Sequence, residues 1–256
     1  MRLNYLEYGK ENNGIIILLH GGGLSWWNYK EVAEILQTDY HVILPILDGH
    51  AGSDKPFTTI ENNAQAIIEF IDNELGGSVL VIGGLSLGGQ ILLEMLSRRK
   101  NICKYAIVES ALVIPSKFTY LMIKPAFGSC YGLIKYKWFS KLQFKSLRIK
   151  SNLFDEYYRD TCAITKSNMI AFLQKNSVYS LKDSIEECEA SVQILVGEKE
   201  NYFMRKSAEI IHEKLKNSFV DVLYNLYHGE FSINHADVYA DKMVEILLKG
   251  EKLWEK

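Results

Sequence analysis

Six short runs of apolar, mostly β-branched residues recur along the chain and predict the strands of a buried sheet. The first run ends in glycines, which is typical of a strand that is covered on both faces. The runs cover residues 15–20, 41–47, 79–82, 105–108 and 192–196, with a weaker one at 219–224.

Stretches with helical spacing separate these runs. Thr58 and Glu61 have the spacing of a capping box, and a helical face follows them at Ile60, Ala64, Ile67, Ile68, Ile71 and Leu75. Residues 204–216 form a second amphipathic stretch, and Asn234 is expected to cap a last helix. Buried strands that alternate with amphipathic helices predict an α/β fold, a mostly parallel central sheet with helices on both faces.

The alternation stops between about residues 114 and 190, where the pattern is helical and rich in aromatic residues. This break predicts a core made of residues 1–113 and 191–256, with residues 114–190 inserted as a helical cap or lid. The inserted stretch carries 12 basic and 7 acidic residues, although the whole chain has a net charge of −2. Such an asymmetry bears on the choice of partner.

Composition excludes several classes of protein. The balanced charge gives no sign of nucleic-acid binding, and no apolar stretch approaches the about 18 residues of a membrane span. The four cysteines are scattered without a C-x-x-C pair, which argues against a zinc cluster and fits a reducing compartment. With no apolar run of signal-peptide length at the N-terminus, a cytoplasmic location is expected.

The segment Gly84-Leu85-Ser86-Leu87-Gly88 fits the pattern G-x-S-x-G. The pattern alone is weak, but here it lies between a predicted strand and a predicted helix at 90–97, the context that a nucleophile elbow requires. The turn would expose Ser86 and place the Leu87 N–H at a helix N-terminus, where it favours an oxyanion. The alternative is a glycine-rich turn in which the serine is a bystander.

A second glycine-rich loop, His20-Gly21-Gly22-Gly23, follows the first run. With it, the sequence resembles the α/β-hydrolase superfamily, in which an H-G-G-G loop after this strand supplies the second oxyanion N–H. The resemblance implies Gly22 for this role, with Gly23 as the second choice. A nucleotide-binding loop does not fit the spacing. His50 lies in a further loop that the family uses for structure, so it is interpreted as a packing residue.

The resemblance also places the other two members of a catalytic triad. Glu200 stands where the family's G-x-x-D motif, after the next-to-last strand, has its aspartate. Glu109, at the end of the 105–108 run, is the alternative acid, because some family members carry it there. His228 directly follows the last run and is the predicted base, whereas His235 is interpreted as a residue at the start of the last helix. The order of serine, acid and histidine is that of the family.

Together these residues predict a serine hydrolase that cleaves an ester or thioester through an acyl-enzyme, without a metal or organic cofactor. Serine at the elbow argues against relatives that use aspartate there, such as haloalkane dehalogenases and epoxide hydrolases. Two other activities stay open, C–C bond hydrolysis and acyl transfer. A non-enzymatic reading stays open as well, a small-molecule receptor that keeps the triad and turns over slowly or not at all.

The predicted cap suggests what the substrate is like. Between Ser110 and Phe154 there are eight basic residues, nine aromatic residues and no acidic residue. Aromatic side chains are expected to wall the pocket, with Trp26, Trp27, Trp138 and Phe139 as candidates, while lysines face solvent or ring its mouth. An anionic or lipid-like acyl substrate, or peripheral contact with anionic lipid, would use this charge. A solvated lid with no such role is the alternative.

Overall fold

The computed structural model describes residues 3–254 and the side chains of residues 3–248. Its centre is a seven-stranded sheet in the order β1-β3-β2-β4-β5-β6-β7. All neighbouring strands run parallel except β1, which pairs antiparallel with β3. The predicted mostly parallel sheet is therefore confirmed. The strands are β1 (Tyr5–Tyr8), β2 (Gly14–Leu19), β3 (Tyr40–Pro45), β4 (Val79–Leu85), β5 (Cys103–Glu109), β6 (Ser191–Gly197) and β7 (Ser218–Leu223).

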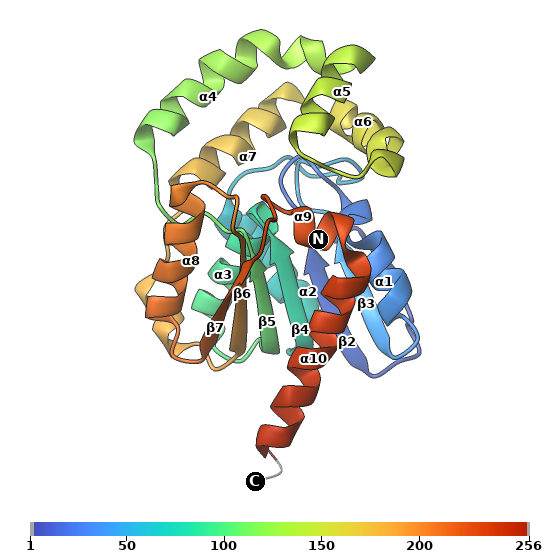
Figure 1. Cartoon of the computed structure of the whole chain (residues 1–256), viewed down its shortest axis with the longest axis vertical. Coiled ribbons are helices and arrows are strands. Elements are labelled where there is room, and N and C mark those ends of the chain that lie inside the picture. Colours follow the sequence, from blue (N-terminus) through green and yellow to red (C-terminus); the bar gives the residue numbers. More distant parts are fainter. Residues whose placement is uncertain (1–2, 255–256) are drawn as a thin grey trace.

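Helices cover both faces of the sheet, because alternate residues of the central strands belong to two separate apolar clusters (Figure 1). Ile17 and Leu19 of β2 pack with α2 (Ile60–Glu74), α3 (Leu87–Arg98) and α8 (Tyr202–Lys214). Ile16 and Leu18 pack with α1 (Lys30–Leu36) and α10 (Ala236–Trp254) on the opposite face. Burial of both faces is what makes the strand sequences continuously apolar.

The chain between β5 and β6 forms helices and short 3-10 turns, and the described part of it contains no strand. Residues 114–190 are called the insertion, and its helices are α4 (Lys117–Cys130), α5 (Lys137–Ser146), α6 (Phe154–Ala163) and α7 (Lys166–Val178). They lie beyond the end of the sheet at which the parallel strands finish (Figure 1). No helix in residues 3–254 is long and apolar enough to cross a membrane.

The insertion is fastened to the core through α6 and α7. The Trp27 indole N–H donates to Asp160 Oδ2 at 3.0 Å, and both side chains are buried. The Phe57 N–H donates to Asn168 Oδ1 at 3.1 Å, and Asn176 Nδ2 donates to Gln90 Oε1 at 2.9 Å. These bonds join residues more than 80 positions apart, so they fix the insertion over the core.

Two predicted helix caps are wrong. Thr59, not Thr58, caps α2, because its Oγ1 accepts from the Asn62 N–H at 3.0 Å. Asn234 is the last residue of the short helix α9 (Glu230–Asn234) and bonds the backbone of Arg148 and Lys150 instead of capping α10. Where several capping residues follow one another, the sequence places the N-cap only to within one or two positions.

Candidate active site

Ser86 occupies a sharp turn between β4 and α3. Its backbone has φ 53° and ψ −109°, a strained conformation for a residue with a Cβ atom. A Cβ atom at Gly84 would lie 2.4 Å from the Gly88 carbonyl oxygen, and one at Gly88 would lie 2.1 Å from the Leu19 carbonyl oxygen. Glycine is thus required at both positions for strand and helix to approach. The strand–turn–helix context expected of the motif is present.

Glu200 and His228 meet at the same end of the sheet. Glu200 follows β6, His228 follows β7, and Glu200 Oε2 lies 2.8 Å from His228 Nδ1. The other carboxylate oxygen of Glu200 accepts from Ser110 Oγ at 2.7 Å and from the Gly197 N–H at 2.8 Å. Burial raises the pKa of the Glu200 carboxyl, but these hydrogen bonds and the nearby His228 outweigh burial and lower the pKa overall.

Glu109, the alternative acid, lies at the end of β5 and is buried. Its Oε1 accepts from the Ser232 N–H at 3.3 Å, whereas Oε2 has no hydrogen-bond partner among the described residues. Burial raises the pKa of this carboxyl to about 7, and the Glu200 carboxylate adds to the increase. The hydrogen bond of Glu109 thus goes to the backbone of α9, whereas Glu200 contacts His228.

Ser86 and His228 line one cavity of about 140 Å³. Gly22 of the glycine loop and Leu147 and Ile149 of the insertion also line it, so core and insertion both shape the space. The full lining is Gly21, Gly22, Leu24, Leu85, Ser86, Leu147, Ile149, His228, Gly229 and Ile233. Apart from the serine and the histidine, every side chain in this lining is apolar or absent.

The predicted aromatic walls are wrong for this cavity, since its lining includes none of Trp26, Trp27, Trp138 and Phe139. Trp27 is buried in the contact with Asp160. Trp138 is 63% exposed on the outer side of α5, with Phe139 packed edge-on against it. The aliphatic side chains of Leu147 and Ile149 form the wall instead. The sequence did not indicate them, because they follow a lysine-rich stretch that is typical of an exposed surface.

The glycine loop lies opposite the elbow. The Gly23 N–H donates to His50 Nε2 at 3.0 Å, so it is already engaged. A Cβ atom at Gly22 would lie 3.5 Å from the Leu87 Cβ and 3.2 Å from the Phe172 ring, which places the Gly22 backbone beside the first residue of α3. His50 is buried, stacks on Phe172 and has a pKa lowered to about 4 by burial. The interpretation of His50 as a packing residue is confirmed.

A wider cavity of about 390 Å³ adjoins the first, and Leu147 and His228 line both. It carries two cations, Arg148 and Lys199, neither of which forms an ion pair with a carboxylate in residues 3–248. The Arg148 guanidinium lies 3.6 Å from the centre of the Tyr227 ring, a cation–π contact that holds it at this position.

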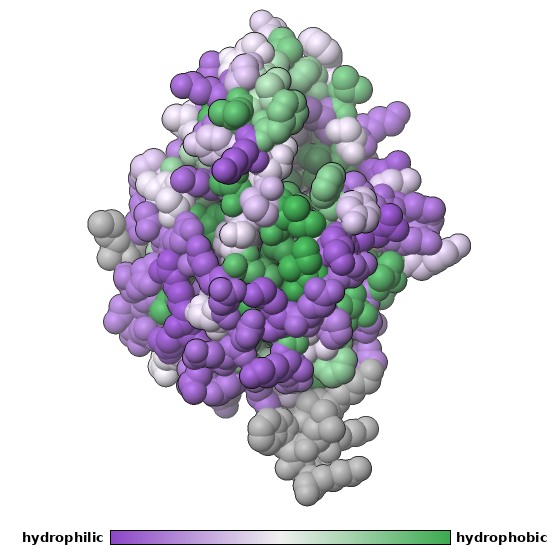
Figure 2. Space-filling view, turned by 90° about the vertical axis from the view of Figure 1, so that its left-hand side faces the viewer, coloured by the Kyte–Doolittle hydropathy of each residue, from purple (hydrophilic) through white to green (hydrophobic). Residues whose placement is uncertain are grey.

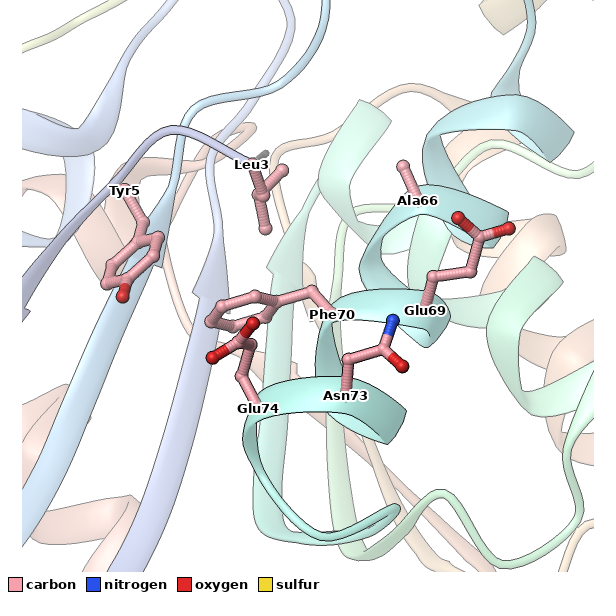
Figure 3. Close-up of a pocket in the computed structure, with 7 residues that line it drawn as sticks. All are labelled: Leu3, Tyr5, Ala66, Glu69, Phe70, Asn73 and Glu74. Atoms are coloured by element: carbon pink, nitrogen blue, oxygen red, sulfur yellow. The ribbon is translucent and has the colours of Figure 1, made fainter. Parts of the chain in front are cut away.

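A third cavity, of about 440 Å³, lies far from these residues, between the N-terminal segment and α2 (Figure 3). Glu69, Phe70, Asn73 and Glu74 of α2 face it from one side, and Leu3 and Tyr5 from the other (Figure 3). Its described lining offers two carboxylates but no serine, cysteine or histidine. Among the residues that the structure describes, no group of three or more His, Cys, Asp or Glu side chains could hold a metal ion.

Comparisons with known proteins agree with this architecture. Among solved structures, an enol-lactonase from Burkholderia xenovorans superposes with a TM-score of 0.81 at 14% identity, covering 96% of each chain. A thermophilic esterase from Thermogutta terrifontis superposes with a TM-score of 0.79 at 16% identity, covering 96% of this chain and 93% of the esterase. At such identities the likeness is one of fold.

Curated relatives include human epoxide hydrolase 4, 24% identical over 190 residues, which are 68% of this chain and 51% of the relative. Epoxide hydrolase 3 of Xenopus tropicalis is 26% identical over 137 residues, which are 51% of this chain and 37% of the relative. The chain thus matches at most about half the length of these two proteins. The model of the Alpha/beta hydrolase family matches residues 16–237, most of the sequence, and the chain belongs to this family.

Proposed function

We propose that the protein hydrolyses esters or thioesters of small acyl groups through a Ser86–His228–Glu200 triad. One observation carries the proposal: a buried carboxylate holds His228 Nδ1 at 2.8 Å, and the ring of this histidine shares a cavity with the strained Ser86. Acid, base and nucleophile come from three separate strand ends, and their order along the chain is that of the family.

The chemistry follows from these positions. His228 takes the proton of Ser86, and Oγ attacks the acyl carbonyl carbon. Glu200, kept ionised by its lowered pKa, stabilises the imidazolium that forms and, by holding Nδ1, leaves Nε2 as the atom that takes the serine proton. His228 then protonates the leaving alcohol or thiol. A water molecule, deprotonated by the same histidine, attacks the acyl-enzyme and releases the acid.

The oxyanion formed at each attack is assigned to the N–H groups of Leu87 and Gly22. Leu87 is the first residue of α3, where the helix N-terminus favours negative charge. The Gly22 backbone lies beside Leu87, and Gly22 lines the cavity that holds Ser86. Gly23, the second choice, is less suited because His50 already accepts from its N–H.

Serine at the elbow supports attack on the carbonyl of an ester or thioester. It argues against the opening of an epoxide, the reaction that the names of the curated relatives indicate. Aspartate-bearing family members attack with a carboxylate, whereas the Ser86 hydroxyl needs the adjacent base to become nucleophilic. The His228–Glu200 pair is that base and its orienting acid.

The two adjoining cavities suggest the substrate. We assign the acyl group to the apolar space of about 140 Å³, which is small beside the roughly 300–1,000 Å³ of pockets for drug-sized ligands. The leaving group is assigned to the wider cavity, where Arg148 and Lys199 favour an anionic one. In this proposal residues 1–113 and 191–256 form the catalytic core, and residues 114–190 act as the cap that closes the site.

Short acyl groups are therefore expected to be preferred. Across a series of esters from acetate to dodecanoate, kcat/KM should peak at four carbons or fewer and fall at least about tenfold by octanoate, because longer chains exceed the cavity. Leu147→Ala enlarges the cavity and should shift the optimum to longer chains. The exposed Leu121→Ala is the matched control, and an unchanged optimum in Leu147→Ala would contradict the assignment.

Glu200→Gln is expected to lower kcat/KM by about 10²–10³-fold, far more than Glu109→Gln, because a neutral amide cannot stabilise the imidazolium. Glu109 contacts the Ser232 backbone, so its amide variant should keep activity within about tenfold of the wild type. Steady-state kinetics on one model ester compare the two. The reverse ranking would transfer the role of the acid to Glu109.

The proposed reaction is tested by labelling with a fluorophosphonate and by turnover on esters and thioesters. Labelling at Ser86 with many turnovers supports the hydrolase. Tight ligand binding with at most one turnover would make the protein a receptor. Product formed only with an added alcohol or thiol acceptor would make it an acyltransferase, and turnover confined to a C–C bonded diketone would make it a C–C hydrolase.

A further inference from the structure

The outer side of α4 presents apolar side chains to solvent. Phe118, Leu121 and Met122 are 74, 67 and 47% exposed, and Pro125 continues their spacing along one face of the helix. Of the α4 side chains only Ile123 is buried, in this fully described helix. In Figure 1, α7 lies between α4 and the sheet, so α4 is the outermost layer of the molecule. The apolar stripe therefore takes no part in the core.

The next helix repeats this arrangement. Trp138 and Leu142, one turn apart on α5, are each 63% exposed, whereas Ser140 and Phe144 are buried. Neither Trp138 nor Leu142 belongs to the two cavities next to His228. In Figure 2 the densest apolar area lies near the middle of the face presented, and apolar side chains mixed with polar ones continue above it. Exposed large apolar groups in such numbers mark an interaction surface.

Lysines flank both stripes, at Lys117, Lys124, Lys137, Lys141 and Lys145. None of these five lysines forms an ion pair in residues 3–248; Lys137 and Lys141 contact only the rings of Tyr158 and Phe154. Lysines elsewhere, such as Lys206 and Lys242, do pair with carboxylates. The positive charge of the two helices is thus left for a partner outside the chain.

We propose that this outer face of α4 and α5 docks on an anionic lipid bilayer. Apolar side chains would enter the boundary between headgroups and acyl chains, and the lysines would lie at the lipid phosphates. Charge complementarity selects this partner over a second copy of the chain, because two such faces would bring ten lysines together without a carboxylate. The proposal goes beyond hydrolysis, since it does not require the chemistry of Ser86.

The test is vesicle co-sedimentation of the full chain carrying Ser86→Ala, so that turnover cannot alter the lipid. Binding is expected to an equal mixture of phosphatidylglycerol and phosphatidylcholine, and not to phosphatidylcholine alone. Two double variants should each weaken vesicle binding about tenfold: one combines Phe118→Ser with Leu121→Ser, and the other combines Trp138→Ser with Leu142→Ser. A triple variant in which Lys137, Lys141 and Lys145 are all replaced by Gln should weaken binding at least as much.

The matched control is Phe219→Ser with Tyr224→Ser, which removes exposed aromatic residues at β7 and should leave vesicle binding unchanged. With Ser86 intact, every surface variant should keep the wild-type rate on a water-soluble acetate ester. Absence of vesicle binding overturns the proposal, and so does binding that only the lysine variants weaken, which is adsorption without insertion. A lipid-free dimer that the apolar variants dissociate would show that the face belongs to a second copy.

Discussion

Replacing Ser86 by alanine is expected to lower kcat/KM for ester hydrolysis at least about 10³-fold, because members of a triad act as a unit and no second nucleophile lies in the cavity lining. Alanine keeps a Cβ atom, so the strained φ of 53° costs the variant as much as it costs the wild type. The free energy of unfolding should therefore be nearly unchanged. Progress curves with a short-chain ester and thermal unfolding measure the two quantities.

Ser86→Cys serves as a second variant, because a Ser86→Ala protein that failed to fold would also lack activity. The cysteine keeps the shape and should label with a thiol reagent from within the cavity. Full activity in Ser86→Ala would remove this serine as nucleophile and, with it, the proposed reaction.

The second large effect is expected from the histidines. His228→Ala should abolish measurable turnover, a loss of at least about 10³-fold, because nothing else in the cavity lining can take the serine proton. His235 lies between α9 and α10, where its carbonyl accepts from the Tyr239 N–H, and His235→Ala should keep activity within about tenfold.

Steady-state kinetics on one ester compare the two histidine variants, and thermal unfolding checks that both keep their fold. An inactive His235→Ala with an active His228→Ala would show that the loop after β7 has been assigned the wrong base.

The strands from β2 to β6 could be predicted from the sequence because burial on both faces makes each one an apolar run. The edge strand β7 gave only a weaker signal, since Asp221 interrupts its run and Phe219 and Val222 are exposed. β1 was missed entirely. Tyr5–Tyr8 is a short edge strand whose residues are all half-buried, so it carries neither an apolar run nor a strict alternation. Its antiparallel pairing with β3 depends on the whole sheet and leaves no local signal.

For the candidate site, motifs predicted which loops would meet, since strand ends of a parallel sheet share one edge. The contact of Glu200 with His228 and the backbone contact of Glu109 required the three-dimensional placement of both loops. The side-chain orientations in the insertion were the hardest feature to predict. Apolar and aromatic residues are spread around its helices, so the sequence does not tell which of them face the core and which face solvent. Composition therefore could not distinguish the exposed Trp138 from Leu147 and Ile149, which line the cavity.

The fastening of α6 and α7 to the core has a consequence for protein engineering. Cutting the chain at residues 113 and 191 to exchange the whole insertion would leave the buried indole N–H of Trp27 without its acceptor and would remove Phe172 from beside Gly22. A chimaera joined there would lose the support of its glycine loop. Exchange of residues 117–146 alone, from the start of α4 to the end of α5, keeps those supports and changes the outer surface, provided that the replacement keeps buried side chains such as Ile123 and Phe144.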